Sequence, residues 1–232
     1  MPHSTYVEPF CGMAGVFLRR RQAVKCEVIN DANGEVANFF RVVQRHHQPF
    51  LDMIRYQVTS RKEFERLAGQ DPSRLTDMER AARFLYLQRI AFGGRPTGRT
   101  FGTARDRPGR FDISKVGPLL QELHERLSAV VLECLDWREI LRRYDGAHTL
   151  CYLDPPYHGN EQDYGRELFA RDDFAEMAQR LSGLKGRFIL SINDTPQIRE
   201  LFGRFDVEAV NTTYTVARRG SSGSAQLIVR GP

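Results

Sequence analysis

The sequence is poor in the residues and runs that build metal, redox and membrane sites. Its four cysteines, Cys11, Cys26, Cys134 and Cys151, are widely spaced, and the lack of a Cys-x-x-Cys pair excludes a zinc ribbon or thioredoxin-like motif. We therefore expect reduced, buried thiols in a cytoplasmic protein. Mean hydropathy is −0.46 and no apolar run approaches the roughly 18 residues of a membrane span. Residues 1–10 also lack the basic and then apolar stretches of a signal peptide.

What is present is the composition of an ordinary globular chain with an uneven charge. The 232 residues are 41% apolar and 27% charged, which suits one large domain or one domain with an insert. Residues 45–115 hold 15 Lys and Arg against 8 Asp and Glu, a net charge of +7, whereas the rest holds 19 against 21, a net charge of −2. This basic middle segment indicates a polyanionic partner or, equally, a solvated arginine-rich surface.

The hydrophobic pattern predicts a parallel α/β sheet that is interrupted by this basic segment. Strand and helix patterns alternate in residues 1–44 and again in 116–232, as in a sheet covered by helices on both faces. We expect strands at 5–8, 24–29, 129–134, 149–153 and 187–192, helices at 14–21, from 35, 119–127 and 172–184, and a final hairpin from 207–216 and 226–229. Residues 45 to about 92 read as helical, and 93–110 read as a loop or hairpin with five arginines and one aspartate.

The sharpest local signal is Leu153-Asp154-Pro155-Pro156-Tyr157, directly after a buried strand. Open α/β sheets bind ligands at the carboxyl ends of their strands. Two prolines fix the backbone and remove two N–H donors, which leaves a carboxylate, carbonyl acceptors and an aromatic face. This set suits a flat ring with an exocyclic amine, held at its edge by Asp154 and the Pro155 carbonyl and stacked on Tyr157. A strand-ending turn with a packed tyrosine is the structural alternative.

Taken with other motifs in order, this tetrapeptide resembles the DPPY-type, alpha-group N6-adenine DNA methyltransferases. The resemblance covers nearly the whole chain and rests on six matches. These are 6–12 (Tyr-Val-Glu-Pro-Phe-Cys-Gly), 31–33 (Asp-Ala-Asn), 84–89 with 92–94 (Phe-Leu-Tyr-Leu-Gln-Arg and Phe-Gly-Gly), Asp136, 153–157 and 188–194 (Phe-Ile-Leu-Ser-Ile-Asn-Asp). It implies a Rossmann-like methyltransferase domain at 1–44 and 116–232, and an inserted target-recognition subdomain at 45–115.

The resemblance also implies the cofactor and its site. S-adenosylmethionine would meet Glu8, Phe10 and Gly12 near its methionine and sulfonium end, Asp31 at its ribose and Asp136 near its adenine. The residues themselves leave alternatives open, because the 8–15 segment could be a plain strand-to-helix turn and Asn30-Asp31 a helix cap. Trp137 could pack on the cofactor adenine or lie in the core. No metal is expected.

The expected partner is double-stranded DNA, from which the target adenine must be flipped. Arg89, Arg95 and Arg99 are the candidate DNA contacts, each with a solvated charge as its alternative. Tyr214, Arg218 and Arg219 lie in the late hairpin and are weaker candidates. We expect a bacterial or phage-encoded cytoplasmic monomer that associates with the nucleoid and has no membrane partner.

Two departures from the family pattern bear on activity. Only about five residues precede the first strand, so the helical Gly-Gly-Lys-type segment that closes over the cofactor is expected to be missing, and Met13-Ala14-Gly15 replaces a glycine-spaced turn. The first departure keeps open a DNA-binding protein whose methyltransferase fold has lost its cofactor. Methylation of another planar amine, such as cytosine N4, RNA or a glutamine amide, is a third reading, against which Asp154 argues.

Overall fold

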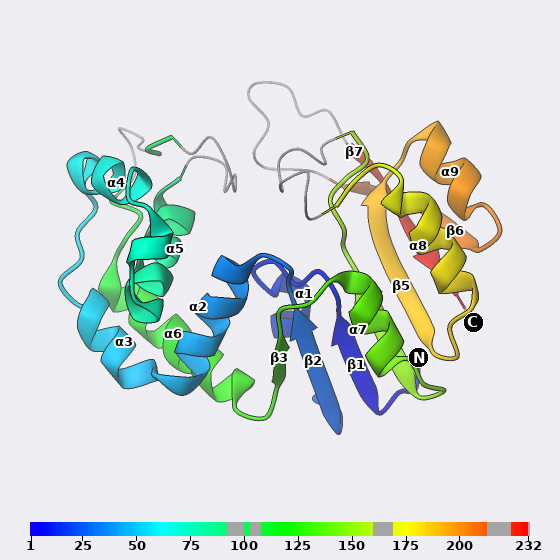
Figure 1. Cartoon of the computed structure of the whole chain (residues 1–232), viewed down its shortest axis with the longest axis horizontal. Helices are drawn as coiled ribbons and strands as arrows, with labels where there is room; N and C mark the ends of the chain where they lie inside the picture. Colours follow the sequence, from blue (N-terminus) through cyan, green and yellow to red (C-terminus); the bar gives the residue numbers. More distant parts are fainter. Residues whose placement is uncertain (92–99, 103–107, 160–168, 213–223, 232) are drawn as a thin grey trace. The chain divides into compact units, whose positions relative to one another are not determined.

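In the computed structural model, the chain forms a mixed sheet with flanking helices and a separate helical unit (Figure 1). The structure describes residues 1–91, 100–102, 108–159, 169–212 and 224–231. The chain divides into two compact units, one of residues 1–32 and 133–232 and the other of 33–132. These boundaries fall 12 residues before the predicted 44/45 junction and 17 after the predicted 115/116 junction. The helices on either side of the basic segment therefore belong to the second unit by compactness.

The sheet has the order β3-β2-β1-β4-β5-β7-β6. Strands β1, β2, β4 and β5 pair in parallel, whereas β7 pairs antiparallel with both β5 and β6. The predicted alternation and the final hairpin are thus confirmed over the described residues. The strands are β1 Thr5–Glu8, β2 Cys26–Asn30, β3 Val131–Glu133, β4 Thr149–Leu153, β5 Arg187–Asn193, β6 Asp206–Thr212 and β7 Ser224–Arg230.

One hydrophobic core joins the sheet to three helices, α7 (Trp137–Tyr144), α8 (Asp173–Ser182) and α9 (Pro196–Phe202). Strand residues of one parity, such as Val7, Cys151 and Leu190, face this core because side chains alternate along a strand. At the ends of β1 and β5, Glu8 and Asn193 have the opposite parity, so their side chains face away from this core. Helix α1 (Gly15–Arg19) follows β1 and buries Phe17.

Two expectations for the sheet and the cysteines are wrong in detail. The predicted buried strand at 129–134 shortens to β3, in which Val131 is 40% exposed, because β3 is the edge of the sheet. The four cysteines are all free, but Cys134 is exposed and Cys26 half-buried, so only Cys11 and Cys151 match the expectation of buried thiols.

The second unit is helical, as the sequence predicts. Its helices are α2 Gly34–Arg45, α3 His47–Ile54, α4 Arg61–Ala68, the short 3-10 helix η1 Pro72–Arg74, α5 Asp77–Ile90 and α6 Ile113–Leu127. In the match to the recognition signature, Phe84, Tyr86 and Leu87 are almost fully buried, and the Phe84 ring lies 5.6 Å from that of Phe39 on α2. The apolar residues of this signature therefore build the core of the unit.

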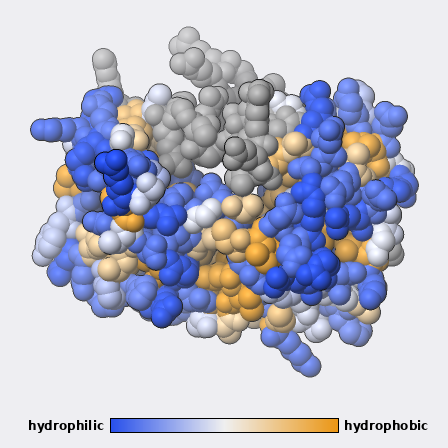
Figure 2. All heavy atoms as spheres, in the orientation of Figure 1, coloured by the Kyte–Doolittle hydropathy of each residue, from blue (hydrophilic) through white to orange (hydrophobic). Residues whose placement is uncertain are grey.

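Hydrophilic side chains cover much of the visible face over α4 and α5 (Figure 2). Several arginines of this unit are paired with acidic side chains, such as Arg66 with Glu63 at 2.7 Å and Arg41 with Asp77 at 2.5 Å. Part of the positive charge of this unit is therefore paired with local acidic side chains, and charge alone does not define a DNA-contacting surface. Among the described residues, no helix is both long and apolar enough to cross a membrane.

Candidate active site

Polar residues gather where β1, β2, β4 and β5 end, at the carboxyl edge of the parallel strands. Ligand sites in open α/β sheets lie at this edge, because the loops that leave neighbouring strands meet there. The residues fall into three groups, and all of them belong to the first unit.

The first group joins the loops after β1 and β2. Gly12 takes the left-handed conformation, with φ of 48°, and its N–H donates to Asp31 Oδ2 at 2.9 Å. Gly12 and Asp31, each predicted to bind the cofactor, are thus in direct contact with one another. Ala14 is also left-handed, with φ of 55°, which costs about 1 kcal/mol for a residue with a Cβ. The turn therefore keeps a left-handed geometry at the position where the family usually spaces its glycines.

Sequence reasoning missed Asn30, which ties these loops together. Its side chain is 1% exposed, donates to the carbonyls of Pro9 at 2.8 Å and Leu135 at 3.0 Å, and accepts from the Leu135 N–H at 2.8 Å. The loops after β1 and β2 are thereby joined to the chain after β3. The helix-cap alternative for Asn30-Asp31 is wrong, because Asn33 is the residue that caps α2, accepting from the Glu35 N–H at 3.0 Å.

The second group is a pair of carboxyl groups, Glu8 at the end of β1 and Asp154 just after β4. Glu8 is 2% exposed and accepts a hydrogen bond from the Tyr6 hydroxyl at 2.5 Å. Burial raises the pKa of Glu8 to about 7, with a further upward contribution from the charge of Asp154. Asp154 is exposed, yet desolvation by the surrounding protein raises its pKa to about 6. Both groups are therefore poorly hydrated acids, and Asp154 is the more accessible of the two.

The third group surrounds the tetrapeptide. Pro155 and Pro156 are buried and Tyr157 is half-buried. The Tyr157 hydroxyl accepts a hydrogen bond from Gln226 Nε2 on β7. The next residue, His158, is held at its backbone by Asn193 on β5: the His158 N–H donates to Asn193 Oδ1 at 2.8 Å, and Asn193 Nδ2 donates to the His158 carbonyl at 2.9 Å. The sequence matched Asn193 to a motif without giving it a role, and did not single out Gln226.

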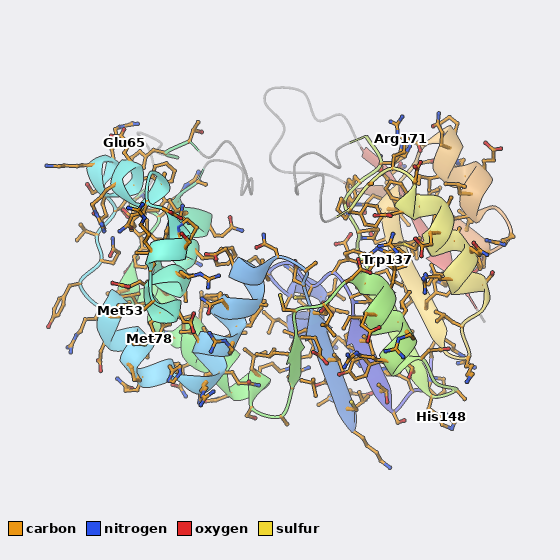
Figure 3. All side chains as sticks on the ribbon, in the orientation of Figure 1. Met53, Glu65, Met78, Trp137, His148 and Arg171 are labelled. Atoms are coloured by element: carbon orange, nitrogen blue, oxygen red, sulfur yellow. The ribbon has the colours of Figure 1, made fainter. Side chains whose placement is uncertain are left out.

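Three other residues predicted to bind the cofactor make packing or helix-capping contacts in the structure. Trp137 is 2% exposed at the start of α7 (Figure 3), and its ring centroid lies 6.4 Å from that of Phe10, so of its two readings the structure favours the core. Phe10 is half-buried and packs edge-on against Phe169 at 5.7 Å. Asp136 is exposed and caps α7 through the Arg138 N–H at 2.8 Å.

Of the predicted DNA contacts, only Arg89 lies among the described residues. It is half-buried in the last turn of α5. Arg95, Arg99, Tyr214, Arg218 and Arg219 lie outside them. No group of three His, Cys, Asp or Glu side chains in the described parts of the chain is arranged to hold a metal ion.

A mostly parallel α/β sheet with an acidic, proline-framed segment at its carboxyl edge fits the class of Rossmann-like methyltransferases. Comparison with known proteins gives the family. The family model for the D12 class of N6 adenine-specific DNA methyltransferases matches residues 1–216, so the chain belongs to this family. Enzymes of this family methylate N6 of adenine in DNA, with S-adenosylmethionine as the methyl donor.

Individual relatives agree with this assignment. The chain is 24% identical over 214 residues to the type II methyltransferase M.CviBI of Paramecium bursaria Chlorella virus NC1A, covering 91% of this chain and 80% of the relative. It is 25% identical over 239 residues to the type II methyltransferase M1.LlaDCHI of Lactococcus lactis subsp. cremoris, covering 95% and 83%. It is also 26% identical to the DNA N-6-adenine-methyltransferase of Escherichia phage P1, covering 93% of this chain and 30% of that longer protein.

Proposed function

We propose that Asp154, Pro155, Pro156 and Tyr157 form the site at which this enzyme holds a flipped-out adenine of double-stranded DNA for methylation at N6. The observation that carries the proposal is the setting of Asp154. It is an exposed but poorly hydrated carboxyl group directly after β4, framed by buried prolines and a half-buried tyrosine. A carboxylate in such a setting interacts strongly with a hydrogen-bond donor, because water competes weakly for it.

The mechanism follows from these groups. The lone pair of the adenine amine is delocalised into the ring, which makes the nitrogen a weak nucleophile. Hydrogen bonds from the amine to the Asp154 carboxylate and the Pro155 carbonyl direct the lone pair toward the methyl donor. As the nitrogen gains positive charge, the Asp154 carboxylate stabilises it electrostatically. Stacking on Tyr157 offsets part of the few kcal/mol that unstacking the base from the duplex costs.

The residues at the ends of β1 and β2 fit S-adenosylmethionine. When bound, this cofactor supplies an electrophilic methyl group on a sulfonium centre. Glu8 and Asp31 provide carboxylates for its cationic groups and ribose hydroxyls, and the left-handed turn at Gly12 exposes backbone close to Asp31. We propose Glu8, Phe10, Gly12 and Asp31 for this role. Asp136 remains a proposal for the adenine end, whereas Trp137 is not carried forward because its ring is buried in the core.

The test is methyl transfer from labelled S-adenosylmethionine to duplex DNA prepared from a methylation-deficient strain, with the product identified by mass spectrometry. We expect N6-methyladenine from the wild-type chain and a loss of at least 100-fold in transfer for Asp154→Ala, with DNA binding retained. Asp172→Ala is the matched control, because Asp172 is an exposed aspartate of the same unit that makes no side-chain cap to α8. Unchanged transfer in Asp154→Ala would refute the proposed site. DNA binding without cofactor binding by the wild type would favour the degenerate-fold alternative instead.

A further inference from the structure

Two amide side chains on neighbouring strands meet the segment that carries the proposed stacking ring. Asn193 ends β5 and Gln226 lies near the start of β7, and the antiparallel register makes them direct cross-strand partners. Both have the strand parity that faces away from the α7–α9 core. The two amides therefore stand side by side at the carboxyl edge of the sheet, where the chain leaves β4.

Each amide holds a different part of the same short segment. Asn193 binds both the N–H and the carbonyl of His158, at 2.8 and 2.9 Å, and so fixes the backbone directly after Tyr157. Gln226 contacts the hydroxyl at the far end of the Tyr157 ring. Pro155 and Pro156 restrict the backbone before the ring. Tyr157 is thus constrained at three points: by the two prolines that precede it, by the hydrogen bonds to His158 that follows it, and by the contact to its own hydroxyl.

The strand pair beneath the two amides is itself anchored. The Asp194 N–H donates to the Ala225 carbonyl at 3.0 Å, which extends the pairing one residue past Asn193. The Asp194 carboxylate accepts two hydrogen bonds from Arg199 at 2.6 and 2.7 Å, and the pKa of Asp194 is accordingly lowered. The two amides are therefore carried by paired strands whose ends are held by further hydrogen bonds.

Base stacking does not explain the hydrogen bond between Gln226 and the Tyr157 hydroxyl. A phenylalanine ring presents as good an aromatic face to a base as a tyrosine ring does, so stacking alone makes no use of the Tyr157 oxygen. We propose that Asn193 and Gln226 are positioning residues that hold the Tyr157 ring in the orientation required for a flipped adenine. This inference rests on the proposed function of Asp154–Tyr157 and adds two residues from β5 and β7 to it.

Positioning of this kind acts on the rate of transfer more than on affinity. A ring that is free to turn lets the amine drift from the geometry needed for in-line attack, and small misplacements at a reacting centre are costly. Gln226→Met keeps the length of the side chain and removes its amide. We expect it to lower the single-turnover methyl-transfer rate about fivefold to tenfold, the equivalent of one neutral hydrogen bond. KM for S-adenosylmethionine should stay within about twofold, because the residues proposed to bind it lie after β1 and β2.

A double-mutant cycle separates positioning from general stability. In a Tyr157→Phe background the hydroxyl is absent, so Gln226→Met should have no further effect on the transfer rate. Gln226→Glu, whose carboxylate can accept a hydrogen bond from the Tyr157 hydroxyl, should restore most of the rate lost in Gln226→Met. Asn193→Asp keeps the acceptor for the His158 N–H but loses the donor to the carbonyl, so its rate should fall less than that of Asn193→Leu. Gln197→Met, which removes an exposed amide on α9, serves as the control and should transfer methyl groups at the wild-type rate.

The outcomes distinguish this inference from the function on which it rests. If Tyr157→Ala transfers methyl groups as fast as the wild type, the proposed stacking role fails. If Tyr157→Ala is slow but Gln226→Met and Asn193→Leu are as fast as the wild type, the stacking role stands and the positioning role is refuted. An equal loss from Gln226→Met in the wild-type and Tyr157→Phe backgrounds would also refute it. Should Asn193→Leu fail to fold, the three Gln226 measurements decide.

Discussion

Ionisation of Glu8 should destabilise the first unit, and the size of the effect follows from the burial of its carboxyl group. Burial raises the pKa of Glu8 from 4.5 to about 7 in the folded protein. Between these two pH values the folded state holds the proton more firmly than the unfolded state, so the free energy of unfolding falls as pH rises through this window. The full loss is about 3 kcal/mol and is reached near pH 8. For a chain of this length it corresponds to a fall in melting temperature of about 6–12 °C.

The perturbation that tests this is Glu8→Gln, which keeps the shape of the side chain and an acceptor for the Tyr6 hydroxyl but cannot ionise. We expect the variant to be more stable than the wild type at pH 8, by up to about 3 kcal/mol, and to differ little from it at pH 5. Urea denaturation followed by tryptophan fluorescence is the appropriate assay. Trp137 is the single tryptophan of the chain and is buried in the core of the first unit, so its signal reports on that unit.

Glu139 provides a control of the opposite sign. It lies on α7 of the same unit, and hydrogen bonds from Arg142 and Arg143 lower its pKa to about 2. Glu139→Gln should therefore reduce stability at pH 8 rather than increase it. A stability difference between wild type and Glu8→Gln that is the same at pH 5 and pH 8 would refute the reasoning. If the difference appears as expected, the enzyme holds a costly buried carboxylate whose ionised form a cationic ligand group would stabilise.

Two further predictions concern the proposed catalytic carboxylate and the second unit. Burial raises the pKa of Asp154 to about 6 in the unliganded protein. The kcat/KM for DNA, which reports groups of the free enzyme, should therefore fall as the pH drops below about 6. The small residual activity of Asp154→Asn should lack this acid limb, and a wild-type kcat/KM that is flat from pH 5 to 8 would contradict the role of Asp154 as an ionised acceptor. Thr76 and Glu79 form a capping box at the start of α5. Thr76→Ala should therefore destabilise the second unit by about 1 kcal/mol, measured by urea denaturation followed by far-UV circular dichroism. Thr76→Ser, which keeps the cap, is the control. An equal loss in Thr76→Ser would show that the hydroxyl cap is not the cause.

The sequence by itself predicted the alternation of strands and helices, although it missed α7 and α9, and the edge of the sheet at which the candidate site is proposed. Both follow from local pattern, because burial imposes a period on each strand and helix, and parallel strands bring their carboxyl ends together. Gly12 and Asp31 were each selected in this way as candidate site residues, but their direct contact was not predicted. The basic segment was likewise recognised as helical from its periodicity, although its capping box at Thr76 went unnoticed.

Only the tertiary structure decided which side chains share that edge. Asn193 and Gln226 lie 35 and 69 residues from the groups that they hold, and no local pattern encodes such a pairing. Trp137 was open between core and ligand because an indole suits both, and only the folded chain shows its ring in the core beside Phe10 and Phe169. The pKa of Glu8 depends on how much protein surrounds its carboxyl group and on the nearby charge of Asp154, which are properties of the folded chain alone.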